Sequence, residues 1–267
     1  MRGPPSEYTK SETKLLLTLW QKLRKAPAMT KLIEEIRQIE FERIKYNQES
    51  EDYFETQEGN IPILISAPHG ARHLRKGKWK EEDEYTASIA IRLGEATGAH
   101  VLYVKNKTYE DSNSLRRTKY KDKVKDIIKH DGIKFLLDIH GAGKNRPFKI
   151  CVGTRYNRED KSSCPTYKDI IEDVLRDFQD PPIFNRRYFK ATKKETVTSF
   201  ARRGCGIESA QVEINARYRI VERKPDSSKA MSGKEPVFEA EEKDVLDLFN
   251  RLKEMILRVS EKIDDQR

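Results

Sequence analysis

The chain has 267 residues, of which 36% are hydrophobic and 36% charged, and its 53 basic and 44 acidic residues give a net charge of +9. This length suits one large α/β domain, and the interspersed charges are typical of an ion-paired surface that does not require a nucleic-acid partner. Three cysteines without a CxxC pair exclude a disulfide framework and a structural cysteine zinc site. No apolar run approaches the ~20 residues of a membrane span, and the N-terminus lacks the apolar core of a signal peptide, so we expect a cytoplasmic protein.

The N-terminal part is predicted to be a helical extension, residues 1–58, packed on a core domain that comprises residues 59–267. Apolar stripes predict two helices within 8–47, with Pro27 between them. The acidic stretch 48–59 is predicted to be a loop.

Strands and helices alternate through the core domain. Short apolar runs and one alternating stretch predict strands at 61–67, 101–104, 135–141, 149–153 and 211–215. Apolar stripes predict helices around 89–96, at 118–130, at 165–179 and over 245–259, and Gly98 is expected to end the first of them. The segments 70–82 and 222–239 are predicted loops. This order predicts a three-layer α/β/α sandwich with a mixed, mostly parallel sheet.

Two histidines stand where predicted strands end, each directly before a glycine. They are His69 in Pro-His-Gly and His140 in Ile-His-Gly, while Glu213 lies on a late strand. Open α/β sheets bind ligands at the carboxyl ends of their strands, and a catalytic zinc takes three protein ligands of these types. The alternative is that each histidine is a hydrogen-bonded turn residue. The spacing alone leaves both interpretations open. His73 is a further candidate ligand, and His100 and His130 are expected to be structural.

Five short motifs occur in an order that resembles the N-formylglutamate amidohydrolase family, which is related to the zinc carboxypeptidases. They span about residues 60–220: Ala-Pro-His-Gly (67–70), Asp-Glu-Tyr-Thr (83–86), Asp-Ser-Asn (111–113), Asp-Ile-His-Gly (138–141) and Gln-Val-Glu-Ile-Asn (211–215). The resemblance implies a zinc-peptidase-like α/β/α sandwich and a catalytic zinc with two histidines and one carboxylate as ligands.

The resemblance assigns roles to particular residues. The metal ligands would be His69, Asp83 and His140, with Glu84 as the fallback for Asp83. The catalytic glutamate would be Glu213, because a water nucleophile needs a base and the leaving amine needs an acid. The alternatives are an acidic first helical turn for Asp83 and Glu84, and an outward-facing strand position for Glu213. Asp138 would orient a ligand or make an ordinary buried hydrogen bond.

The substrate-binding residues depart from the family pattern. Asn113 matches the asparagine of an Asp-x-Asn-Arg motif that binds a substrate carboxylate, but Ser114 stands where the arginine is expected. Arg116 or Arg117 is a candidate replacement, and Arg202 is a candidate anion clamp. Each of these arginines has an ordinary solvated surface position as its alternative.

The sequence therefore predicts a hydrolase with one zinc ion per chain that cleaves an amide bond in an acidic N-acyl amino acid or peptide. The rival hypothesis is a degenerate hydrolase scaffold that binds nucleic acid or protein. It draws on the helical extension, on the basic loop 72–80 with Trp79, and on the departure at Ser114.

Overall fold

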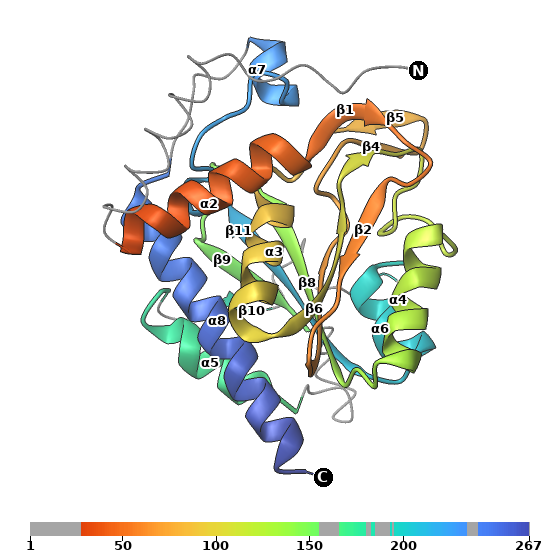
Figure 1. Ribbon diagram of the computed structural model, residues 1–267, viewed down its shortest axis with the longest axis vertical. Coiled ribbons are helices and arrows are strands. Elements are labelled where there is room, and N and C mark those ends of the chain that lie inside the picture. Colours follow the sequence, from red (N-terminus) through yellow and green to blue (C-terminus); the bar gives the residue numbers. More distant parts are fainter. Residues whose placement is uncertain are drawn as a thin grey trace, which may run out of the picture.

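The computed structural model describes residues 28–154, 166–179, 183–184, 193, 195–233 and 240–266. Its middle layer is a seven-stranded sheet with the order β10-β9-β11-β8-β3-β6-β2 (Figure 1). The strands of this sheet are β2 (Phe54–Gln57), β3 (Ile61–Ala67), β6 (Ala99–Val104), β8 (Phe135–Ala142), β9 (Ile150–Gly153), β10 (Ile183–Phe184) and β11 (Glu208–Asn215).

The four central strands β11, β8, β3 and β6 are parallel to one another. They read as continuous buried runs because both faces of the sheet are covered. The outer strands β9 and β2 run antiparallel to β11 and β6, so the sheet is mixed. Because the four central strands run in the same direction, the carboxyl ends of β3, β8 and β11 lie at the same end of the sheet.

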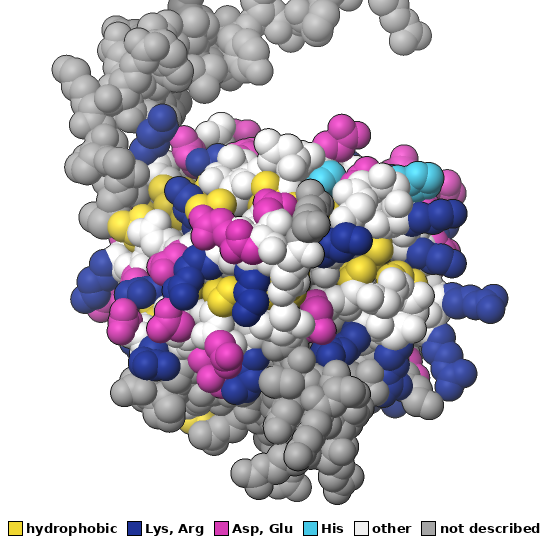
Figure 2. Space-filling model, turned by 90° about the horizontal axis from the view of Figure 1, so that it is seen from below, with side chains coloured by type: hydrophobic (Ala, Val, Ile, Leu, Met, Phe, Trp, Pro, Cys, Tyr) yellow, Lys and Arg dark blue, Asp and Glu magenta, His cyan; other side chains and the backbone are white. Residues whose placement is uncertain are grey.

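Helices cover both faces of the sheet (Figure 1), and both basic and acidic side chains are spread over the surface that Figure 2 shows from below. One face packs against α3 (Thr86–Thr97), α5 (Lys168–Arg176) and α8 (Glu242–Asp264), and the other against α4 (Lys119–His130) and α6 (Val197–Gly204). Helix α2 (Ala28–Arg43) lies outside the first layer, where it contacts α3 and α8. The predicted three-layer sandwich with a mixed, mostly parallel sheet is therefore confirmed.

The end of α3 shows how a single residue sets a helix boundary. Gly98 has a φ of 78°, and its backbone N–H donates to the carbonyl of Gly94. Because L-residues avoid this left-handed region, glycine ends the helix here at little cost and β6 can begin at once. The predicted stop at Gly98 is confirmed.

Three of the predicted loops contain regular structure. The segment 48–59 includes the end of β1 (Lys45–Glu49) and all of β2, so that loop prediction was wrong. The segment 70–82 contains the hairpin of β4 (His73–Arg75) and β5 (Lys78–Lys80), and 222–239 contains the short helix α7 (Ser228–Ser232). These elements are polar edge strands or single turns, which leave little hydrophobic periodicity in the sequence.

The two predicted helices of the N-terminal part have different outcomes. The second is α2, which ends at Arg43, and β1 follows it and pairs with β7 (Asn106–Lys107). The first falls on residues outside the described part of the chain. Among the described helices, none combines the length and the apolar character that crossing a bilayer requires.

Candidate metal centre

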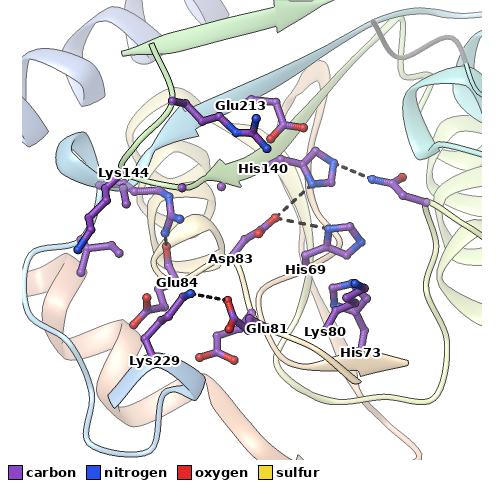
Figure 3. A pocket seen from close by; sticks show the side chains of 18 of the residues that line it. His69, His73, Lys80, Glu81, Asp83, Glu84, His140, Lys144, Glu213 and Lys229 are labelled. Carbon is purple, nitrogen blue, oxygen red and sulfur yellow. Dashed lines mark hydrogen bonds and ion pairs between the residues drawn. The ribbon is translucent and has the colours of Figure 1, made fainter. Parts of the chain in front are cut away.

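Three side chains converge at the carboxyl edge of the central strands. His69 follows β3, His140 lies near the end of β8, and Asp83 precedes α3. The Nδ1 atoms of both histidines lie 3.4 Å from the same oxygen, Asp83 Oδ2. Figure 3 shows the Asp83 carboxylate between the two imidazole rings. The predicted ligand set is therefore brought together in space.

The turn that carries Asp83 is fixed by its own backbone. The amide of Asp83 donates to the carbonyl of His69 at 2.8 Å, and the Asp83 carbonyl accepts from the amide and hydroxyl of Thr86 at the start of α3. Tyr85 has a φ of 67°, a region that costs an aromatic residue roughly 1–3 kcal/mol. Glu40 of α2 compensates, because its carboxylate accepts from the Tyr85 amide at 2.7 Å and from the Ser88 hydroxyl.

Each histidine is oriented by a buried carboxylate on its far side. His69 Nε2 lies 3.1 Å from Asp111 Oδ1, and His140 Nε2 lies 3.0 Å from Asp138 Oδ2. Both carboxylates are fully buried, and Asp138 also accepts from the Ser66 hydroxyl. An ionised carboxylate can only accept, so each Nε2 donates to its carboxylate while each Nδ1 faces Asp83. Such carboxylate–histidine pairs commonly orient metal ligands.

The pKa values of all three central groups are shifted from their ordinary values. Burial alone would lower the pKa of His140, but Asp138 and Asp83 outweigh it and raise that pKa well above its usual value. His69 shows the same balance, with Asp111 and Asp83 raising its pKa. Burial would raise the pKa of Asp83, yet the two histidines hold it well below the usual range. The cluster thus holds its charges by mutual attraction.

The donor set fits a zinc ion. Two imidazole nitrogens and one carboxylate oxygen are ligands that catalytic zinc takes, with a fourth position left for water. Zinc–ligand distances of about 2.0–2.1 Å place neighbouring tetrahedral ligands roughly 3.3 Å apart. The two separations of 3.4 Å to Asp83 Oδ2 match this spacing.

Glu213 lies directly beside this group. In the parallel pairing of β11 with β8 it is the register partner of His140. Its side chain is 7% exposed and accepts a hydrogen bond of 2.5 Å from Gln211. Burial raises the pKa of Glu213 to about 7, partly offset by His140. A carboxyl group with this pKa can take up and release a proton near neutral pH.

Glu84, the fallback ligand, does not join the three ligands. Its carboxylate forms a buried ion pair of 2.7 Å with Arg223, which lies in the segment 222–239 that the sequence predicts to be a loop. Burial raises the pKa of Glu84 to about 7, against the opposing effect of Arg223 and Arg219.

A second cluster, formed by His69, His73 and Asp111, adjoins the first. The rings of His69 and His73 stack with their centroids 4.0 Å apart. Arg75 also donates from Nε to Asp111, so a cation already lies at that carboxylate. Burial and the neighbouring His69 lower the pKa of His73 to about 3, which leaves it neutral.

The expected substrate-binding residues are not brought together. Asn113 lines the cavity, with its amide nitrogen 2.9 Å from His140 Nε2 and its amide oxygen accepting from the Val197 backbone. The Arg116 side chain is 84% exposed and faces Glu195. Arg202 pairs with Glu208 at 3.6 Å, and neither arginine lines the cavity.

A cavity of about 690 Å³ opens over the cluster. Sequence reasoning missed most of its charged wall, because these residues come from segments far apart in the chain. Its basic members are Arg75, Lys80, Lys144, Arg146, Lys193, Arg219, Arg223 and Lys229. Only Arg75 and Lys80 belong to the segment 72–80, which the sequence predicts to be a basic loop.

The remaining histidines and Trp79 lie outside the cluster. His100 pairs with Asp131 at 3.5 Å in a different cavity, and His130 is exposed. Trp79 contacts Tyr109, and the ammonium of Lys107 lies 4.0 Å from its ring centroid.

The comparisons with known proteins concern the fold. No family model matches the sequence, and no curated protein matches it. Among solved structures, N-formylglutamate amidohydrolase from Ralstonia eutropha JMP134 is similar with a TM-score of 0.50 at 14% identity, over 80% of this chain and 99% of that one. A gene product from Agrobacterium tumefaciens gives a TM-score of 0.50 at 11% identity, over 79% and 96%.

A bacteriophage poly-γ-glutamate hydrolase gives a TM-score of 0.44 at 15% identity, over 80% of this chain and 96% of that one. The similarity to the Ralstonia eutropha structure, with its TM-score of 0.50, shows that this chain shares the α/β fold of that protein. That fold is the one expected from the resemblance to N-formylglutamate amidohydrolase stated above.

Proposed function

We propose that the protein is a zinc-dependent amidohydrolase with one ion per chain, held by His69, Asp83 and His140. The observation that carries this proposal is the convergence of two histidine Nδ1 atoms on one carboxylate oxygen, with both Nε2 atoms held from behind by buried carboxylates. Glu213 beside His140 supplies the remaining group that amide hydrolysis needs.

The proposed reaction adds water to an amide carbonyl and breaks the C–N bond to give a carboxylic acid and an amine, after which the acid ionises and its proton passes to the amine. A zinc ion at this site supplies a Lewis acid that polarises the scissile carbonyl. Glu213 takes one proton from the attacking water and then donates it to the leaving nitrogen, so that the glutamate ends the cycle ionised as it began. A pKa of about 7 suits both steps. Asp111 and Asp138 keep the imidazoles in the orientation that the metal requires.

We propose an acidic substrate, an N-acyl amino acid such as an N-formylglutamate-like compound, or an acidic peptide. The charge of the cavity wall supports this class. Its eight basic residues outnumber its five carboxylates, and two of those carboxylates are Asp83 and Glu213 themselves. Clefts lined by one sign of charge raise the local concentration of ligands of the opposite sign.

The first experiment is elemental analysis of the purified protein beside three variants. We expect about one zinc per chain in the wild type. We expect its loss in His69→Ala and His140→Ala, and its retention in His130→Ala, which removes an exposed histidine outside the cluster. No bound zinc, and no uptake after zinc is added, would contradict the proposed function and favour the binding-module hypothesis.

The second experiment tests the reaction on N-formylglutamate and acidic peptides. We expect activity that chelation abolishes and zinc restores. Glu213→Gln should lower kcat by about 100-fold or more while retaining zinc, because general acid–base catalysis typically contributes 10²–10⁴-fold. Zinc-dependent hydrolysis that survives Glu213→Gln would rule out the role given to this residue.

A further inference from the structure

Arg219 is a buried arginine that the proposed function uses only as part of the basic cavity wall. It directly follows the 3₁₀ helix η2 (Ala216–Tyr218), which continues from the end of β11, and its side chain lines the cavity. The residue is only 5% exposed. Burying a guanidinium is costly unless its donors are satisfied, so its partners indicate what it does.

The guanidinium of Arg219 contacts three separate chain segments. Its Nε donates to the carbonyl of Ile214 at 3.1 Å, and its Nη1 donates to the carbonyl of Glu84. Its third neighbour is Gly141, where a Cβ atom would lie 2.5 Å from Nη2 and 2.7 Å from Cζ. The guanidinium therefore packs against the bare backbone of this glycine.

Each contacted residue is the one that follows a residue of the site. Ile214 follows Glu213, Glu84 follows Asp83, and Gly141 follows His140. The planar guanidinium thus contacts the backbone near the end of β11, in the loop before α3 and near the end of β8. Those three segments carry the acid–base residue and two of the three proposed ligands.

An arginine suits this position better than any other cation. Its guanidinium presents donors in a rigid plane, so two carbonyls and a flat backbone surface can be met at once. A lysine ammonium is a point charge on a flexible stem. Any side chain at residue 141 larger than glycine's hydrogen would displace the guanidinium of Arg219. Close packing against this group therefore requires glycine at position 141, in addition to its place near the strand end.

We propose that Arg219 is a positioning residue that fixes the spacing between Glu213, Asp83 and His140 through the backbone that follows each of them. The inference rests on the proposed function for its catalytic consequence. The positioning of the three backbone segments by Arg219 also holds for the metal-free protein. The role of Arg219 and the proposed function can therefore be tested separately.

The test compares Arg219→Lys with Arg217→Lys, which changes an exposed arginine within η2 itself. Amide hydrogen exchange of the metal-free proteins should accelerate by about tenfold in Arg219→Lys within 82–86, 138–142 and 212–216, because two buried carbonyls lose their donors there. Exchange in α8 and β6 should stay at the wild-type rate. Arg217→Lys should match the wild type throughout.

A second pair of variants leaves the arginine in place. Gly141→Ala puts a methyl group where the guanidinium lies, whereas Gly143→Ala has no atom within 4 Å of the added Cβ. We expect the same three segments to loosen in Gly141→Ala and none in Gly143→Ala. If Arg219→Lys fails to fold, this pair decides the question.

Zinc affinity and kinetics supply the readout that a merely structural role would leave unchanged. In Arg219→Lys we expect zinc to bind about 10- to 100-fold more weakly, and kcat at saturating zinc to fall more than KM changes. Unchanged exchange in the three segments, or equal acceleration across the whole sheet, would overturn the proposal. Absence of zinc from the wild type would instead contradict the proposed function, and exchange would still decide the role of Arg219.

Discussion

Glu213→Gln should make the metal-free protein more stable than the wild type at high pH, although it removes the proposed acid–base group. The folded-state pKa of Glu213 is raised by burial to about 7, against an ordinary value of 4.5. For an acid with a raised pKa the folded state binds the proton more tightly. Stability is therefore fully present below the unfolded pKa and is lost as pH rises through the folded pKa. Glutamine stays neutral and escapes this loss.

The size of the effect follows from the shift. Each pKa unit corresponds to about 1.36 kcal/mol, so full ionisation of Glu213 costs roughly 3 kcal/mol, of which about 2 kcal/mol appears between pH 5.5 and pH 8.5. The amide oxygen of glutamine can still accept the hydrogen bond from Gln211. The free energy of unfolding of Glu213→Gln should therefore rise relative to that of the wild type as pH rises.

The assay is urea unfolding of chelator-treated protein at several pH values in this window. The control is Glu58→Gln, which neutralises an exposed carboxylate and should run parallel to the wild type. A constant difference in unfolding free energy between Glu213→Gln and the wild type across the window would refute the reasoning.

Three further predictions concern the metal and the parts that hold its ligands. Chelation should lower the stability of the zinc-loaded protein by about 2.7 kcal/mol when free zinc had stood at 100 times Kd, and an unfolding midpoint that ignores chelator would contradict this. Asp138→Asn should weaken zinc binding by about 10- to 100-fold in chelator competition, because the partner of His140 Nε2 loses its charge. Glu40→Ala should lower the unfolding free energy by about 3 kcal/mol, since Tyr85 and other buried donors lose their acceptor, while Glu42→Ala at an exposed site should not.

The parts of the fold that the sequence predicts are those with a strong one-dimensional pattern. The runs that became β3 and β8 are apolar because both faces of the sheet are covered, and α8 shows a sustained apolar stripe. Strand β2 reads Phe-Glu-Thr-Gln and lies at the edge of the sheet, where half-exposed positions accept polar residues. Its pairing with β6 is a long-range contact that no local pattern encodes.

The candidate site divides in the same way. His69, His140 and Glu213 stand at strand ends, so topology alone gathers them. Asp83 lies on a loop, and only the resemblance to a known family picked it out. Arg219 could not be inferred at all, because its hydrogen-bond partners are backbone carbonyls, one of them that of the distant Glu84, and its role depends on their spacing. Arg116 is the opposite case, because it lies close to Asn113 in the sequence and yet its side chain is 84% exposed and faces Glu195.

The two buried carboxylate–histidine pairs also determine what the proposed zinc ion would have to displace. Because Asp138 and Asp111 raise the pKa values of His140 and His69, both metal-free imidazoles keep their second proton to a higher pH than a free histidine does. Binding of a metal ion would then displace protons from the imidazoles, and these protons would be released to the solvent. In calorimetry the apparent heat of zinc binding should change with the ionisation enthalpy of the buffer. The apparent affinity should climb as pH rises, until both rings are neutral before the metal arrives.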